Sequence, residues 1–81
     1  MGHSRAQLRT PADFGNALGS ARRARGITQQ QLAAELGVPQ STVSQLESGQ
    51  STIYLRRVLA AARTLDMQLF AEWNDDDDAS G

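Results

Sequence analysis

Apolar residues recur at intervals of three and four in four successive segments of the chain, which is the spacing of one face of an α-helix. The clearest pattern spans residues 52–65, where the expected buried positions are Leu55, Val58, Leu59, Ala62 and Leu65. The three earlier segments are shorter, and their expected buried positions are Phe14, Leu18 and Ala21, then Leu32, Ala33 and Leu36, then Val43 and Leu46. The pattern therefore predicts four amphipathic helices.

Capping residues predict where these helices begin. Thr10 followed by Pro11 suits the start of the first helix, because threonine can accept a hydrogen bond from a free amide and proline fits the first helical position. Thr28 precedes Gln31 by three residues, which is the spacing of a capping box at the start of the second helix. The fourth helix is expected to begin near Ser51 or Thr52.

Glycines predict where the first three helices end. Gly26, Gly37 and Gly49 each follow a helical pattern and can adopt the left-handed conformation that ends a helix. The third helix is expected to begin at Pro39 or Gln40, about three residues after the second one ends. So short a connection holds the second and third helices at a steep angle to each other.

The spacing of apolar residues changes to two after Asp66, which predicts one strand over residues 67–73. Residues 1–9 show no periodicity and are expected to form a flexible N-terminal arm, so the strand has no predicted partner within the chain. We therefore expect it to pair with a second copy in a homodimer, through Met67, Leu69, Phe70, Ala71 and Trp73. The alternative is that this segment extends the fourth helix or packs irregularly.

The length of 81 residues allows one folded domain, expected over residues 10–73. Residues 1–73 contain eight arginines and five acidic residues, a net charge of +3, whereas Asp75–Asp78 contribute −4. Residues 74–81 are therefore expected to be a disordered acidic tail, which either improves solubility or competes with a polyanion for the basic domain. No apolar run reaches the roughly 18 residues that span a bilayer, so a cytoplasmic protein with no membrane association is expected.

The composition argues against an enzyme. The chain has no cysteine, its one histidine is His3 near the N-terminus, and no glycine-rich phosphate loop is present. A metal site needs several converging ligands, and a lone terminal histidine does not supply them. We therefore expect no catalytic site, no metal and no cofactor.

The second and third predicted helices have the format in which one helix enters the DNA major groove while another crosses its N-terminal end. Because Val43 and Leu46 face inward, the third helix presents Gln40, Ser41, Ser44 and Gln45 outward. Glutamine can pair with adenine and serine can bond several base edges, so these side chains suit base reading. On an isolated helix the same residues would be interpreted as a solvated face.

Residues 28–49 resemble the Xre helix-turn-helix family, whose members are similar to phage repressors. The matching positions are Gln29, Leu32, Ala33, Gly37, Gln40, Val43, Leu46, Glu47 and Gly49. The resemblance implies an all-α, four-helix, lambda-repressor-like domain that binds DNA, with Gln29 contacting a backbone phosphate and with base readers at Gln40, Ser41, Ser44 and Gln45. It also implies a structural pair between Arg22 and Glu47. Further candidates for phosphate contact are Thr42, Arg23 and Arg25, with Arg56 and Arg57.

The order of elements over about residues 10–73, including the ending Leu65-Asp-Met-Gln-Leu69 that leads into a strand, resembles HipB-type antitoxins. That resemblance implies a homodimer whose C-terminal strands pair across the two-fold axis. It also implies binding to a palindromic operator, repression of the protein's own operon and a complex with a HipA-like serine/threonine kinase toxin. The alternative is a stand-alone Xre-family repressor with no toxin partner.

Overall fold

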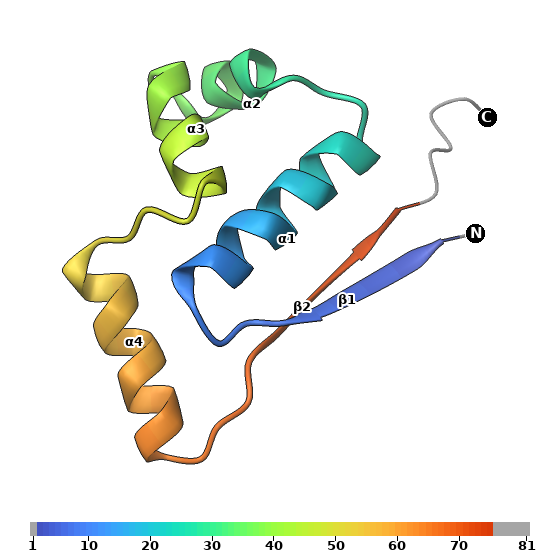
Figure 1. Cartoon of the computed structure of the whole chain (residues 1–81). Helices are drawn as coiled ribbons and strands as arrows, with labels where there is room; N and C mark the ends of the chain where they lie inside the picture. The colour runs from blue at the N-terminus through green and yellow to red at the C-terminus, as the bar shows by residue number, and fades with distance from the viewer. Residues whose placement is uncertain (1, 76–81) are drawn as a thin grey trace.

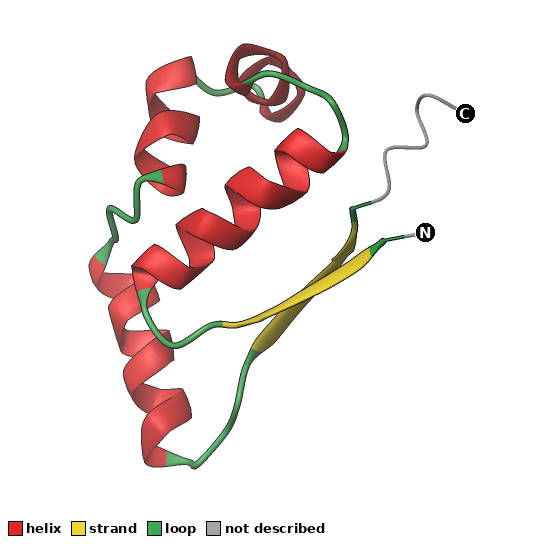
Figure 2. Cartoon of the chain, turned by 45° about the vertical axis from the view of Figure 1, so that its right-hand side comes forward, coloured by secondary structure: helices red, strands yellow, loops and turns green. Residues whose placement is uncertain are grey.

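The computed structural model describes residues 2–75, which form four helices and one two-stranded antiparallel sheet (Figure 1). The elements in chain order are β1 His3–Gln7, α1 Pro11–Ala24, α2 Gln29–Leu36, α3 Gln40–Glu47, α4 Ile53–Thr64 and β2 Phe70–Asn74. The four predicted helices are therefore present. Helix α1 lies between the two strands and the α2–α3 pair (Figure 2).

The predicted capping residues begin the helices. The Thr10 hydroxyl accepts a hydrogen bond from the Asp13 amide at 3.2 Å, and the Asp13 carboxylate accepts one from the Thr10 amide at 3.0 Å. The same reciprocal arrangement joins Thr28 and Gln31 at the start of α2. Each capping box satisfies amides that the first helical turn would otherwise leave unpaired. Thr52 caps α4 through the amide of Leu55.

The N-terminal segment is a strand, so the prediction that residues 1–9 form a flexible arm is wrong for β1. Strand β1 pairs antiparallel with β2, with Ala6 opposite Ala71 and Ser4 opposite Trp73. Residues 3–7 contain none of the residues that favour strands (Val, Ile, Thr, Phe, Tyr or Trp), and strand formation there depends on the cross-strand neighbours that β2 provides. The guanidinium of Arg5, for example, lies 4.0 Å from the centre of the Phe70 ring.

This pairing also corrects the prediction that the C-terminal strand finds its partner only in a second copy. The strand begins at Phe70 rather than at residue 67, and β1 of the same chain occupies one of its edges. Asn74 belongs to β2, and the amide of Asp75 donates to the carbonyl of Gly2 at 3.2 Å, so the predicted disordered tail does not begin at residue 74. The rest of that tail, residues 76–81, lies outside the described residues, as does Met1.

The core is small and is made of Leu8, Ala17, Ala33, Val43, Leu59 and Ala62. Five of the positions predicted to be buried are instead substantially exposed, namely Leu18, Leu36, Leu46, Val58 and Leu65. Periodicity identifies the apolar face of each helix, but burial requires another element packed over that face, and within residues 2–75 these five side chains are only partly covered.

None of the helices described for residues 2–75 has the length and apolar character needed to cross a lipid bilayer.

Candidate functional site

Helices α2 and α3 form a tightly connected pair. Gly37 ends α2 in the left-handed conformation (φ 71°), and the following Val38 amide donates to the carbonyl of Ala33 at 3.0 Å. Helix α3 begins directly after Pro39, whose carbonyl accepts a hydrogen bond from the Thr42 amide at 3.0 Å. Val43 has no exposed surface and anchors α3 to the rest of the domain. The opposite face of α3 is therefore held outward by a rigid connection and a buried anchor.

The outward face of α3 carries the predicted base-reading residues. Gln40, Ser41, Ser44 and Gln45 are all exposed, and none of them is used to fill the core. The structure thus places four side chains with both donor and acceptor groups on one face of one short helix. Such a face can meet a polar surface whose pattern of donors and acceptors varies, such as the edges of base pairs.

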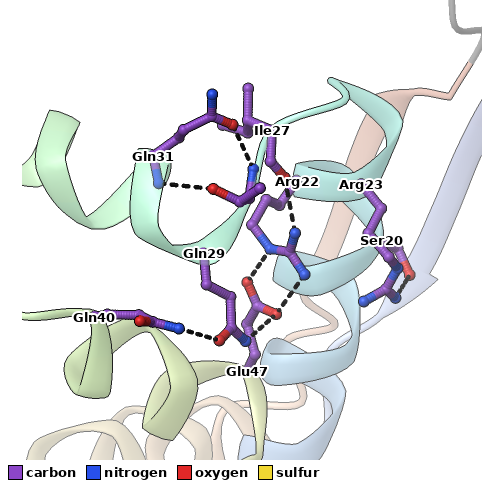
Figure 3. A network of polar contacts seen from close by, with 9 residues as sticks. Ser20, Arg22, Arg23, Ile27, Gln29, Gln31, Gln40 and Glu47 are labelled. Atoms are coloured by element: carbon purple, nitrogen blue, oxygen red, sulfur yellow. Dashed lines mark hydrogen bonds and ion pairs between the residues drawn. The ribbon is translucent and has the colours of Figure 1, made fainter.

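A chain of polar side chains runs behind this face and connects three helices (Figure 3). The side-chain amide of Gln29, at the start of α2, donates to Glu47 Oε1 at 3.1 Å. Gln29 Oε1 in turn accepts a hydrogen bond from the side-chain amide of Gln40 at 3.5 Å. The predicted phosphate-contacting residue and one predicted base-reading residue therefore touch each other, and Gln29 is fixed from behind by Glu47.

Glu47 is held by a bidentate ion pair with Arg22 of α1. Arg22 Nε lies 2.6 Å from Glu47 Oε2, and Arg22 Nη2 lies 3.1 Å from Glu47 Oε1, in the parallel geometry that a guanidinium and a carboxylate prefer. The third donor, Arg22 Nη1, reaches the carbonyl of Ile27 at 2.8 Å. Only 12% of the Arg22 side chain and 8% of the Glu47 side chain are exposed. The pair therefore ties the end of α3 to α1 and to the turn before α2.

The environment of Glu47 also keeps it ionised. The hydrogen bonds from Arg22 lower the pKa of the Glu47 carboxyl, and the bond from Gln29 and the charges of Arg22 and Arg23 act in the same direction against the effect of burial. The bond to Glu47 raises the pKa of Arg22. The polar chain thus contains one negative and one positive charge that neutralise each other beneath the exposed face of α3.

Two glycines that sequence reasoning missed allow α1 to approach α3. A Cβ atom on Gly15 would lie 2.6 Å from the carbonyl oxygens of Leu46 and Glu47, which is well inside van der Waals contact. A Cβ on Gly19 would lie 3.1 Å from Glu47 Oε1. The signal available in the sequence was the spacing of four within a predicted helix, which places both glycines on one face.

Arginines flank the α2–α3 pair in the sequence. Arg23 and Arg25 are exposed at the C-terminal end of α1, just before α2, and Thr42 is half-buried on α3. Arg56, at the start of α4, donates to the hydroxyl of Ser51 at 2.9 Å and to its carbonyl at 3.4 Å. This last contact fixes one arginine beside the loop that leaves α3.

The predicted dimerisation residues divide into two groups. Leu69, Ala71 and Trp73 are half-buried, and β2 packs near α1. Met67 and Phe70 remain exposed, by 53% and 42%. Three of the five residues are therefore partly covered within one chain.

Residues 2–75 contain no group of three or more histidine, cysteine, aspartate or glutamate side chains that could hold a metal ion.

Comparison with known proteins gives one match. A family model described as helix-turn-helix matches residues 18–70, which include α2, α3, α4 and all the residues of the polar chain. No curated protein and no solved structure matches the chain.

Proposed function

Since the chain belongs to the helix-turn-helix family of DNA-binding transcription regulators, of the Xre type, we propose that it is a sequence-specific repressor that reads its operator with α3. The single observation that carries the proposal is the exposed face of Gln40, Ser41, Ser44 and Gln45 on a helix that Val43 and the polar chain hold rigidly. In this proposal α3 lies in the major groove and α2 crosses its N-terminal end. The activity is binding without catalysis, on nucleoid DNA in the cytoplasm.

The polar chain orders part of the DNA-binding face in the free protein. Because Gln29 accepts from Gln40 and donates to Glu47, the Gln40 amide already has a partner that favours one orientation in the free protein. A side chain that is ordered in advance loses less conformational entropy when it bonds a base. The N-terminus of α2 supplies amides without intrahelical acceptors, which suit a phosphate beside Gln29. Arg23, Arg25 and Thr42 would add further backbone contacts.

We further propose that the repressor is a HipB-type antitoxin, which binds a palindromic operator as a homodimer and holds a HipA-like serine/threonine kinase toxin. Support comes from the element order, from Thr10 at the start of α1 to a strand after α4. The edge of β2 that β1 leaves unpaired is available for the strand pairing expected in such a dimer. Two-fold symmetry would place the two copies of α3 about one turn of DNA, roughly 34 Å, apart.

Base reading is tested by measuring affinity for an operator selected from a random DNA library, in parallel with unrelated DNA. Gln40→Ala should lose about 1–3 kcal/mol on the operator and little on unrelated DNA, because it removes one bidentate base contact. The matched control is Gln68→Ala, the same substitution at an exposed site in the linker after α4. Equal losses by Gln40→Ala on both DNAs would show that α3 does not read bases.

The antitoxin role is tested by co-expression with a kinase encoded beside the gene. An antitoxin should co-purify with the kinase and relieve the growth arrest that the kinase causes. A protein that represses its operator and neither binds the kinase nor relieves the arrest would be the alternative, a stand-alone Xre-family repressor.

A further inference from the structure

Helix α4 exposes an apolar stripe made of Tyr54, Val58, Ala61 and Leu65. The spacing of four, three and four residues puts these side chains in one line along the helix. Tyr54 is 75% exposed, Val58 55% and Leu65 68%, and Ala61 is exposed as well. No charged residue lies within the stripe.

The stripe continues the face that α4 buries within its own chain. Leu59 and Ala62 are buried and Leu55 is half-buried, and Val58 and Leu65 come next to them around the helix. The apolar arc of α4 is therefore about twice as wide as the part that the rest of the chain covers. An arc of this width is typical of a helix that is covered from two directions.

The exposed area is sizeable for a chain this small. With Met67, which is 53% exposed just after the helix, the stripe offers on the order of 500 Å² of surface, near the upper end of the largest apolar patch on an ordinary monomer. Two such surfaces facing each other would bury about 1,000 Å², which is the lower end for a specific interface. Within residues 2–75 no other element covers the stripe, and a second copy of the chain would bring an apolar surface of matching size.

The order of side chains in the stripe is symmetric about its midpoint, which lies between Leu59 and Ala60. Two antiparallel copies of α4 would therefore place Tyr54 opposite Leu65 of the other copy and Val58 opposite Ala61 of the other copy. Large side chains would meet at the two ends and smaller ones at the crossing, where the helices approach most closely. A two-fold interface requires a surface that is complementary to itself in this way.

We propose that the α4 stripe is a self-association surface, on which a second copy of this chain docks its own α4 antiparallel. The inference rests on the proposed dimeric repressor, and it assigns the main contact of that dimer to α4 instead of to the free edge of β2 that a HipB-type strand pairing would use. Since β1 already satisfies one edge of β2, the main gain from a second copy is burial of apolar surface, and α4 offers more of it than the strands do.

The first test places a charge in the stripe of the full chain. Val58→Glu should raise the dissociation constant of the dimer more than ~100-fold, because a two-fold interface would bury two unpaired carboxylates. The control is Ala60→Glu, the same change in charge at an exposed position on another side of α4, and it should remain dimeric. Sedimentation velocity over a concentration series measures both. A monomeric wild-type protein at ~100 µM, or a dimeric Val58→Glu variant with native helical circular dichroism, would overturn the proposal.

The second test does not depend on whether Val58→Glu folds. The natural chain has no cysteine, so Tyr54→Cys combined with Leu65→Cys introduces the only two thiols. These positions lie about 16 Å apart along one helix, too far for a disulfide within one chain, but they face each other between antiparallel copies. Mild oxidation should give a covalent dimer on a non-reducing gel, whereas Ala60→Cys should form no cross-link and should migrate as a single chain on the same gel. Absence of the cross-link in the double variant, or equal cross-linking of both, would contradict the antiparallel arrangement.

DNA binding separates failure of this inference from failure of the proposed function. A Val58→Glu monomer should keep its affinity for a single half-site and lose the extra affinity for the palindrome. A wild-type chain that dimerises through α4 and binds no specific DNA would refute the repressor and leave the interface intact. A wild-type chain that binds its operator as a monomer would refute the interface and leave base reading intact.

Discussion

Replacing Gly15 with alanine should destabilise the protein, which is opposite to the usual effect of this substitution inside a helix. Alanine is favoured over glycine in a helix interior by about 1 kcal/mol. At Gly15, however, the new Cβ would lie 2.6 Å from two carbonyl oxygens of α3. Those atoms belong to the backbone and cannot rotate away, so α1 and α3 must separate.

The size of the effect follows from these two opposing contributions. Overpacking by one methyl group costs about 1–3 kcal/mol in well-packed cores, and a clash with backbone on a rigid helix belongs at or above the upper end of that range. After subtraction of the gain in helix propensity, we expect a net loss of about 2 kcal/mol. For a domain of this size that corresponds to a fall in Tm of about 10 °C.

The assay is thermal and urea unfolding followed by circular dichroism, with Asn16→Ala as control. Asn16 is the next residue of α1 and is exposed, so alanine there should stabilise the helix by a few tenths of a kcal/mol or leave it unchanged. Gly15→Ala should also weaken operator binding, because the carbonyls it displaces lie at the end of α3. If Gly15→Ala were as stable as the wild type or more so, the close approach of α1 to α3 would not be a constraint.

Three other substitutions test separate parts of the structure. Glu47→Gln should cost about 2–3 kcal/mol at pH 7 in urea unfolding, because it leaves Arg22 largely buried without its counter-charge. Because the pKa of Glu47 is lowered in the folded protein, the carboxylate stabilises the fold above its unfolded pKa, near 4.5, and this stabilisation is lost as the pH falls through the folded pKa. The wild type and Glu47→Gln should therefore converge in stability at acidic pH. A constant difference between them down to pH 2 would contradict the ion-pair account. Asp66→Gly should raise the Tm by a few degrees. Asp66 has a left-handed backbone (φ 58°), which glycine adopts more easily, and its negative charge lies unfavourably just after the C-terminus of α4. An unchanged or lower Tm would show that neither feature destabilises the protein. Gln29→Ala should weaken binding to every DNA sequence, because it removes a phosphate contact. It should also reduce discrimination at the base read by Gln40, which competition between operator variants would measure. Unchanged discrimination would mean that Gln29 does not orient Gln40.

The helices and their boundaries were predictable because their signals are local. The capping boxes at Thr10 and Thr28 involve residues three apart, and the left-handed glycine after α2 ends the helix through contacts within one turn. The helix-turn-helix arrangement follows from the short connection between α2 and α3, which leaves few relative orientations. The exposure of Gln40 and Gln45 on α3 follows from the helical period once Val43 is known to be inside.

The elements that sequence reasoning missed depend on partners far away in the chain. Strand β1 has no strand-forming residues of its own and exists because β2, about 67 residues later, supplies hydrogen bonds and an aromatic ring for Arg5. The close approach at Gly15 is likewise decided by where α3 lies, which no spacing within α1 can reveal.

The sequence by itself determined which segments are helices, which of their faces are apolar and which side chains α3 presents, because all of these depend on neighbours within about one turn of helix. Tertiary structure alone decided how much of each apolar face is covered. Val58 and Leu65 carry the same periodic signal as Leu59 and Ala62, yet the first two are exposed and the last two are buried. Periodicity shows that one face of a helix is apolar and is stabilised by burial. The arrangement of the other helices and strands decides whether the same chain covers that face.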